Sequence, residues 1–425
     1  MKIKVYPASL HGCIPAISSK SDVHRKLICA ALSAAPSHLR LNEISEDIRA
    51  TVSCLNALSA KITEEAGGFS IRPIHLDDLP ESPSLNCGES GSTLRFLLPV
   101  VGALGCSGTF TASGRLPERP LSPLREELES HGCILSPENE WPLHLEGQLQ
   151  PGIYHMAGNV SSQYFTGLLL ALSLLPEESS LMYDSNPESA GYIRMTTAVL
   201  EQFGAPVSSL MTGWRIPGGI RFQAPQWINA EGDWSNAAFW LVAGALSGRI
   251  TLSGLNPDSL QADRLILQLL QQTGTAVSQT DSEITIEQSP LQAVNLDAAM
   301  VPDIVPIWTV AAANASGITT IRNAGRLRLK ESDRLESISA ALNSLGAEIR
   351  ELPDGLVITG HPDSLNGGQV SGANDHRIVM SLAVAALHSK QPVTIDGAEA
   401  VQKSYPHFFD DLNSLGGKID VLNDR

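Results

Sequence analysis

A short pattern of apolar and small residues occurs six times along the chain. Its last copy, Leu412–Ile419, reads LNSLGGKI: a leucine, a glycine four positions later and a β-branched residue three positions after that. This pattern predicts the last turn of an amphipathic helix, a glycine in the left-handed conformation beyond it, and the start of a strand. The earlier copies lie about 70 residues apart, one with serine in place of the glycine: Leu342–Ile349, Leu270–Val277, Leu200–Val207, Leu128–Leu135 and Leu55–Ile62.

A second series of apolar runs alternates with the first. Several of these runs precede a short alternating strand pattern such as Gly317–Arg322, so each predicts a buried helix followed by a strand. One repeat then contains a helix, a strand, a loop, a second helix, a corner and a strand. We therefore expect an α/β (α+β) protein of six small subdomains in two groups of three. The runs are near Leu27–Leu32, Leu94–Leu104, Phe165–Leu175, Ala237–Leu246, Ile304–Ala313 and Ile378–Leu387.

Composition narrows the class of protein. Among 425 residues, 43% are apolar and 17% charged, which is typical of a globular protein. The longest apolar runs span about a dozen residues, too few to cross a bilayer. A net charge of −16 argues against nucleic acid or an anionic membrane as partner, because both require a broad basic face. The alternating start of the chain does not resemble a signal peptide, so we expect a cytoplasmic protein.

Six cysteines lie in the first third of the chain without a Cys-x-x-Cys pair. This spacing predicts neither a metal site nor a disulfide framework. We expect small buried cysteines instead.

Hydroxyl groups and cations gather where the apolar helices of the first half should begin. Lys20 and Arg25 flank Ser21 at the first helix start, and cations there oppose the helix dipole unless an anion is bound. The second start, Cys87–Arg95, offers glycine and hydroxyl groups suited to phosphate. Ordinary helix capping remains the alternative for each site. The further candidates are Arg115 and Arg119 in a proline-rich loop, Ser161, Ser162 and Gln163 at the third start, and Ser189 in the loop after it.

The second half carries acids as well as cations. Asp303 precedes an apolar helix, where a carboxylate against apolar walls is a candidate base. Arg326, Arg328 and Lys330 alternate, which would place three cations on one side of the chain; a charged helix start with internal salt pairs is the alternative. His376 and Arg377 open the sixth apolar helix. The fourth helix start lacks basic residues, and we expect it to be structural.

Taken together and in order, these motifs resemble those of the 5-enolpyruvylshikimate-3-phosphate synthases along the whole chain. The resemblance rests on Ser-Lys-Ser with Arg25, Gly-x-Ser-Gly-Ser-Thr-x-Arg, Glu-Arg-Pro, Ser-Ser-Gln, Pro-Asp, Leu-Lys-Glu-Ser-Asp-Arg, Asn-Asp-His-Arg and Lys403. It implies the two-domain enolpyruvyl transferase fold, an inverse α/β barrel with three βαββαβ-like repeats per domain. It also implies domains of residues 17–229 and of 1–16 plus 230–425, with hinges near 16–20 and 228–232.

The resemblance further implies transfer of the enolpyruvyl group of phosphoenolpyruvate to shikimate 3-phosphate by a monomer, without a metal or other cofactor. The catalytic residues would be Lys20, Asp303, Lys330, Glu331 and His376. Shikimate 3-phosphate would be held by Lys20, Ser21, Arg25, Ser161, Ser162, Gln163, Ser189, Asp303 and Lys330. Phosphoenolpyruvate would be held by Lys20, Gly91, Arg119, Gln163, Arg334, Arg377 and Lys403. Lys20 and Asp303 would both face water, so replacing either should barely change thermal stability.

Two positions depart from the family pattern, and two other functions remain open. Glu89 and Arg326 each stand where the family commonly has asparagine. A UDP-N-acetylglucosamine enolpyruvyl transferase would share fold and chemistry, but it should carry a reactive cysteine in the Gly114–Pro120 loop, which has none. A non-catalytic anion-binding scaffold would not need Asp303, Glu331 and His376.

Overall fold

Two compact units make up the computed structural model, which describes residues 1–362 and 365–422. Unit 1 comprises Met1–Ser19 and Glu231–Arg425, and unit 2 comprises Lys20–Ala230. The domain boundaries expected from the sequence, at residues 17 and 230, lie within three residues of these divisions. Residues 363–364 and 423–425 of the expected C-terminal domain lie outside the described part of the chain.

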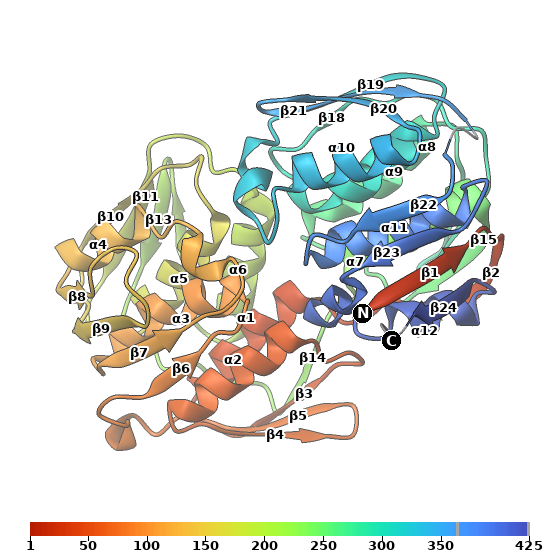
Figure 1. The fold of residues 1–425 in the computed structure, drawn as a ribbon. Coiled ribbons are helices and arrows are strands. Elements are labelled where there is room, and N and C mark those ends of the chain that lie inside the picture. The colour runs from red at the N-terminus through yellow and green to blue at the C-terminus, as the bar shows by residue number, and fades with distance from the viewer. Residues whose placement is uncertain (363–364, 423–425) are drawn as a thin grey trace. The chain divides into compact units, whose positions relative to one another are not determined.

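Unit 2 contains three similar repeats (Figure 1). Its helices and strands are α1 (Lys20–Ala31), β3 (Ser37–Arg40), α2 (Glu46–Ala57), β4 (Lys61–Glu65), β5 (Gly68–Arg72), β6 (Ser84–Asn86), α3 (Gly91–Leu104), β7 (Gly108–Thr111), α4 (Leu124–Ser130), β8 (Cys133–Leu135), β9 (Leu143–Gly147), β10 (Ile153–Met156), α5 (Ser162–Leu172), β11 (Ser179–Tyr183), α6 (Ala190–Gln202), β12 (Ser208–Leu210), β13 (Gly213–Ile216) and β14 (Trp227–Asn229).

Unit 1 repeats the same plan. Its helices and strands are β1 (Lys2–Tyr6), β2 (Leu10–Pro15), α7 (Trp234–Ser247), β15 (Gly248–Ser253), α8 (Leu265–Gln272), β16 (Ala276–Gln279), β17 (Glu283–Glu287), β18 (Leu296–Asp297), α9 (Val305–Ala313), β19 (Gly317–Arg322), α10 (Arg334–Ser344), β20 (Glu348–Leu352), β21 (Gly355–Gly360), β22 (Gly368–Ser371), α11 (His376–Leu387), β23 (Val393–Asp396), α12 (Phe408–Ser414) and β24 (Lys418–Leu422). Four short 3₁₀ segments bear on the site, namely η3 (Ala262–Arg264), η4 (Pro302–Ile304), η5 (Gly325–Leu329) and η6 (Ala398–Lys403).

The strands of the described residues form six four-stranded sheets with one common pairing pattern. In the sheet β6-β7-β9-β8, the first pair is parallel and the next two are antiparallel. Leu85 of β6 lies opposite Phe110 of β7, which in turn lies opposite Leu143 of β9, and all three are buried. These inward-facing residues form the side of the sheet that covers the helices.

The six helix-to-strand corners are confirmed. In each of the six copies of the pattern, the residue at the glycine position has a positive φ, between 74° and 101°. This includes Ser59, at 74°, which stands in place of the glycine. Glycine adopts this conformation without steric cost, so five of the six corners are unstrained. The glycines are Gly132, Gly204, Gly274, Gly346 and Gly416.

The order of elements within a repeat differs from the βαββαβ that the family resemblance implied. One strand separates the two helices, as β7 separates α3 from α4, and two strands then follow the second helix, as β8 and β9 follow α4. The repeat is therefore βαβαββ. The sequence pattern itself placed one strand between the two helices, as in the structure, but it did not include the strand before the apolar helix, which is only two residues long in β18.

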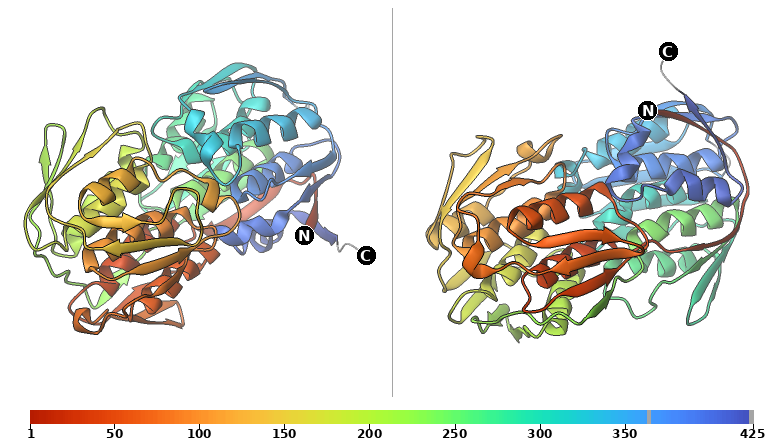
Figure 2. Two further views of the ribbon diagram at one scale, coloured as in Figure 1. Left: turned by 60° about the vertical axis from the view of Figure 1, so that its left-hand side comes forward. Right: turned by 90° about the horizontal axis from the view of Figure 1, so that it is seen from below.

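The apolar helices form the interior of each unit, and the sheets lie outside them (Figure 2). Every residue of α7 and of α9 is buried, and in unit 1 the helices α7, α9 and α11 pack against one another. The apolar runs of the sequence therefore predicted the central helices correctly.

The N-terminal segment completes two different sheets of unit 1. Strand β1 lies between β23 and β24 and is antiparallel to both, and β2 is parallel to β15. Figure 2 shows this red segment running along the outside of unit 1, from the blue strands to the green ones.

None of the helices described is long and apolar enough to cross a membrane. The cysteines are free thiols, and five of them are buried as expected. Cys13, on β2, is exposed, so the prediction was wrong for that residue.

Candidate active site

Unit 1 holds a buried network of charges around Arg334, the first residue of α10. The guanidinium donates from Nε to Asp375 Oδ2 at 2.8 Å, from Nη1 to Asp303 Oδ1 at 3.0 Å and from Nη2 to Glu331 Oε2 at 2.7 Å. Arg334 is only 2% exposed, and Asp375 is fully buried. Three carboxylates hold the pKa of Arg334 well above its usual range in spite of burial, so its charge is permanent.

Arg377, in the first turn of α11, extends this network. Its Nη2 lies 3.3 Å from Asp303 Oδ2, and its Nη1 donates to the Asp303 carbonyl at 3.2 Å. Asp375 caps α11 by accepting from the Arg377 backbone N–H at 2.9 Å. The side chain of His376, which is also buried, has Nδ1 3.9 Å from Asp375 Oδ1. The predicted residues Asp303, Glu331, Arg334, His376 and Arg377 therefore lie together in unit 1.

Lys403, near the end of η6, is close to the same helix start. Its ammonium donates to the carbonyl of Asn374 at 2.6 Å, just before the cap of α11. Lys330 and Glu331 are half-buried in the segment between η5 and α10. This hydrogen bond holds the Lys403 ammonium beside the start of α11.

The expected row of three cations before α10 was wrong. Residues 325–329 form η5 and not an extended strand, so the alternation of Arg326, Arg328 and Lys330 in the sequence does not place them on one side of the chain. Arg328 pairs with Asp333 at 2.8 Å and Glu351 at 2.7 Å. Arg326 donates to the carbonyl of Ala299. Salt pairs within the segment, the alternative left open by the sequence, describe Arg328 correctly.

In unit 2, Lys20 is the first residue of α1 and pairs with Asp47 of α2. Their Nζ–Oδ2 distance is 2.7 Å, and both side chains are partly exposed. Ser21 follows it, and its carbonyl accepts from Arg25 Nη1 at 2.6 Å. Asp47 could not be identified from the sequence, because its pairing depends on how α2 packs against α1.

Arg25 joins three helices of unit 2. It donates to Thr196 Oγ1 of α6 at 2.8 Å, to Thr166 Oγ1 of α5 at 3.1 Å and to the Tyr192 carbonyl at 3.0 Å. Burial lowers its pKa to about 10. These contacts give Arg25 a structural role, and its assignment to a ligand stays a prediction.

A second group of predicted residues meets at the start of α3. Gly91 is the first residue of the helix, and a Cβ there would lie 2.7 Å from Arg95 Nη1 and 2.8 Å from Arg119 Nη1. Gln163 of α5 accepts from Arg95 Nη1 at 2.9 Å and donates to Ser92 Oγ at 3.0 Å. Two guanidinium groups against a helix N-terminus suit a phosphate or carboxylate. Arg95 was not predicted as a site residue, although its position one turn after Gly91 could have indicated it.

Three predicted serines lie at helix starts of unit 2. Ser161 caps α5 by accepting from the Gln163 N–H at 3.3 Å, and Ser162 is the first helical residue. Ser189 precedes α6 with φ 53° and does not use its side chain as a cap. Capping thus explains Ser161 and leaves Ser189 unexplained.

Glu89, the first departure from the family pattern, packs against the loop that leads to Arg119. Its carboxylate occupies the space that a side chain at Gly114 would need, and Gly114 has φ 57°. Arg119 lies in the same loop, five residues farther along the chain.

A buried histidine lies behind the start of α1. His24 is fully buried, and its Nδ1 lies 2.8 Å from Thr51 Oγ1. The hydroxyls of Thr51, Thr93 and Ser90 continue this chain to the cap of α3, each 2.7 Å from the next. Burial, with the charges of Lys20 and Arg25, holds the pKa of His24 well below its usual value.

We expect unit 2 to lose stability as the pH falls below about 6.5. His24 of the unfolded chain becomes protonated there, whereas the buried His24 of the folded chain stays neutral because its pKa is lower. The loss should reach roughly 1 kcal/mol per pH unit. Urea unfolding of the wild-type protein and of His24→Gln at pH 7.5 and 5.5 checks this. The variant should lose less stability between the two pH values. His155→Gln, at an exposed position, is the control, and equal slopes for all three proteins would contradict the prediction.

Comparisons with known proteins cover nearly the whole chain. The family model of EPSP synthase (3-phosphoshikimate 1-carboxyvinyltransferase) matches residues 6–412. Two relatives named 3-phosphoshikimate 1-carboxyvinyltransferase, from Clostridium kluyveri and Clostridium acetobutylicum, are each 40% identical over 98% of this chain and 98% of their own.

Solved structures show the same fold. An EPSP synthase from Acinetobacter baumannii superposes with a TM-score of 0.82 at 24% identity, covering 99% of this chain and 100% of that one. The enolpyruvyl transferase NikO from Streptomyces tendae gives 0.79 at 18% identity, covering 99% and 98%. The expectation of the two-domain enolpyruvyl transferase fold is thereby confirmed.

Proposed function

The chain belongs to the EPSP synthase family, and from this membership we infer that the protein is a 3-phosphoshikimate 1-carboxyvinyltransferase. It transfers the enolpyruvyl group of phosphoenolpyruvate to the 5-hydroxyl of shikimate 3-phosphate and releases phosphate, in the shikimate pathway to chorismate and the aromatic amino acids. The observation that carries this inference is the match to relatives of that name at 40% identity over 98% of both chains. It favours this reaction over transfer to UDP-N-acetylglucosamine and over a non-catalytic scaffold.

The reaction needs a base, an acid and compensation for negative charge. The 5-hydroxyl oxygen adds to C2 of phosphoenolpyruvate and loses its proton, while C3 gains a proton. The tetrahedral intermediate then loses a proton from the new methyl group and expels phosphate. We assign the base to Asp303, assisted by Lys330, and the acid to Glu331, with Lys20 and His376 assisting. Asp303 and Glu331 are supported by their shared contact with Arg334, at 3.0 Å and 2.7 Å.

Phosphoenolpyruvate carries a carboxylate and a phosphate, and each requires cations. We assign its carboxylate to Arg334 and Arg377, because a planar guanidinium group can bind a carboxylate through two parallel hydrogen bonds. The guanidinium of Arg119, which lies against Gly91, and the amide of Gln163 support a phosphate site at the start of α3. The proposed phosphate residues are Lys20, Gly91, Arg119, Gln163 and Lys403.

We assign shikimate 3-phosphate mainly to unit 2. Hydroxyl groups at the starts of α1 and α5, next to cationic side chains, support this assignment. The residues are Lys20, Ser21, Arg25, Ser161, Ser162, Gln163 and Ser189, together with Asp303 and Lys330 of unit 1.

Two further properties are proposed with the function. Phosphoenolpyruvate is too highly charged to cross a bilayer, so the enzyme should act where this metabolite is made, in the cytoplasm. We also propose a monomer, because one chain carries all the residues assigned above.

Phosphate release tests the function directly. The purified protein should release phosphate from phosphoenolpyruvate when shikimate 3-phosphate is present, and should not do so with UDP-N-acetylglucosamine. Shikimate without its phosphate is a matched control and should support far slower release. Release with the nucleotide sugar alone would overturn the proposed reaction, and release with neither acceptor would support the non-catalytic scaffold.

A further inference from the structure

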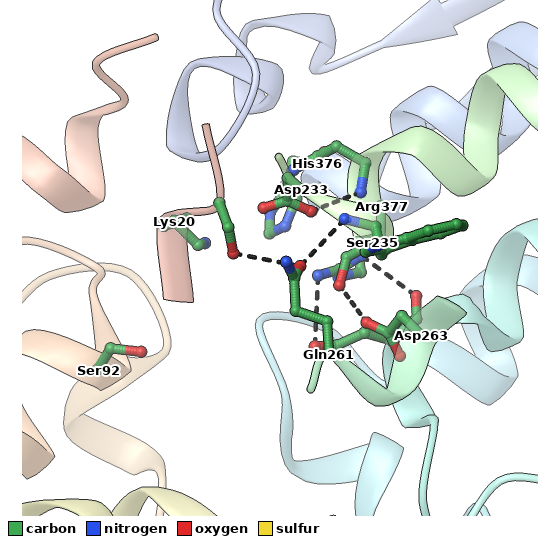
Figure 3. Close-up of polar contacts among 12 residues, drawn as sticks. Lys20, Ser92, Asp233, Ser235, Gln261, Asp263, His376 and Arg377 are labelled. Atoms are coloured by element: carbon green, nitrogen blue, oxygen red, sulfur yellow. Dashed lines mark hydrogen bonds and ion pairs between the residues drawn. The ribbon is translucent and has the colours of Figure 1, made fainter. Parts of the chain in front are cut away.

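The fourth repeat, which the sequence predicted to be only structural, contains a buried acid near the charge network. Asp263 lies on η3, immediately before α8, and is 1% exposed. Ser235, in the first turn of α7, donates its hydroxyl to Asp263 Oδ2. Figure 3 shows Ser235 pointing at Asp263, with Arg377 in the same cluster.

The scaffolding tasks of this region belong to other side chains. Asp233 caps α7 by accepting from the Asn236 N–H at 2.8 Å. Gln261 ties the loop together, since it accepts from the Trp234 N–H at 3.0 Å and donates to the Gly232 carbonyl at 2.7 Å. Neither the helix cap nor the loop therefore requires a carboxylate at position 263.

The charges that face Asp263 come from three neighbouring elements. They are Asp233 at the start of α7, Asp303 on η4 and Arg377 on α11. A buried carboxylate needs a compensating cation or hydrogen-bond donor, and Arg377 is the cation among these three groups. Arg377 is also the residue that grips Asp303 through both of its terminal nitrogens. The positive charge of Arg377 therefore acts on Asp263 electrostatically, while its guanidinium contacts Asp303 directly.

These opposing influences leave the carboxyl group sensitive to pH. Burial, followed by repulsion from Asp303, raises the pKa of Asp263 to about 6, while Arg377 and the Ser235 hydroxyl act in the opposite direction. Above that pH the side chain is ionised and can attract Arg377. Below it the side chain becomes neutral and the attraction weakens.

We propose that Asp263 is a positioning residue for phosphoenolpyruvate binding: its carboxylate, held by Ser235, fixes the guanidinium of Arg377 in the orientation that receives the substrate carboxylate. This proposal rests on the proposed function, through the assignment of Arg377 to phosphoenolpyruvate. Asp263 does not touch the substrate. It acts on the side chain that does, and it makes the fourth repeat part of the site.

Asp263→Asn removes the charge and keeps the size of the side chain. In phosphate-release assays at pH 7.5, the variant should raise the KM for phosphoenolpyruvate about tenfold, with the KM for shikimate 3-phosphate within twofold and kcat within threefold of wild type. Asp258→Asn, at an exposed position of the preceding loop, is the matched control and should leave all three constants unchanged.

The pH profile separates positioning from simple support of the fold. Wild-type kcat/KM for phosphoenolpyruvate should fall in acid with an apparent pKa near 6, and this fall should be absent from Asp263→Asn. Ser235→Ala removes a donor that lowers the pKa of Asp263, so in this variant the fall should begin at a higher pH. If Asp263→Asn folds poorly, Ser235→Ala alone decides the question.

Arg377→Gln separates the role of Asp263 from the proposed function. Arg377→Gln should raise the KM for phosphoenolpyruvate. If it does so while Asp263→Asn leaves both that KM and the fall of kcat/KM in acid at wild-type values, the role of Asp263 is overturned and the proposed function stands. An Asp263→Asn variant that raises both KM values equally, or a Ser235→Ala variant with an unshifted acid limb, also overturns it. No phosphate release by the wild-type protein would instead overturn the proposed function.

Discussion

Asp303→Asn should lower kcat for phosphate release about a thousandfold, because a positioned general base contributes roughly 10²–10⁴ to such a step. The amide cannot accept the proton of the 5-hydroxyl. It also presents an NH₂ group to Arg334 or Arg377, each of which now donates to a carboxylate oxygen. Steady-state phosphate release at saturating concentrations of both substrates measures the effect.

The control for this change is Asp297→Asn, at an exposed position six residues earlier, which should keep kcat within twofold. A kcat for Asp303→Asn within tenfold of wild type would refute the assignment of the base. The contacts also alter the expectation that stability would hardly change at this site. Asp303 neutralises two buried guanidinium groups, so we expect a lower melting temperature as well as lower turnover.

Arg334→Ala should cause the largest loss of stability among the site residues. It would leave Asp375, Glu331 and Asp303 with one cation fewer, and Asp375 is fully buried. Removing one partner of a buried ion pair costs about 3–5 kcal/mol, since the remaining charge stays desolvated. Urea unfolding followed by the fluorescence of Trp240 and Trp308, both buried in unit 1, measures this loss.

Arg328→Ala is the matched control for Arg334→Ala. Arg328 also contacts two carboxylates, but its side chain is 27% exposed. Water screens such a pair, so the cost should stay near 1 kcal/mol or below. Equal losses for the two variants would show that burial does not set the strength of the Arg334 network.

Local chemistry explains why the sequence predicted the repeat so well. A corner after a helix needs a residue with positive φ, and glycine satisfies that need wherever it stands. The same spacing located Ser59, whose φ of 74° shows that position in the fold can outweigh residue preference. Likewise, an apolar run without charged residues predicts a fully buried helix such as α9, because it has no strongly hydrated face.

Pairing between distant segments was harder to predict. Asp375 was identifiable as the cap of α11, but its contact with Arg334, 41 positions earlier, depends on how α10 and α11 pack. The alternating cations of residues 326–330 suggested three charges on one side of the chain, whereas Arg328 lies in the 3₁₀ segment η5 and pairs with Asp333 and Glu351. Asp263 carried no motif at all, and only its burial beside Ser235 and Arg377 reveals it.

The placement of β1 between β23 and β24 bears on biosynthesis. Ribosomes make the chain from its N-terminus at about 5–20 residues per second, and Lys2 pairs with Asp396. The first strand must therefore wait roughly 20–80 s before its partners exist, whereas Lys20–Ala230 is continuous and can fold while translation proceeds. During that interval β1 presents an unpaired edge, so nascent chains would benefit from a chaperone that covers their first residues.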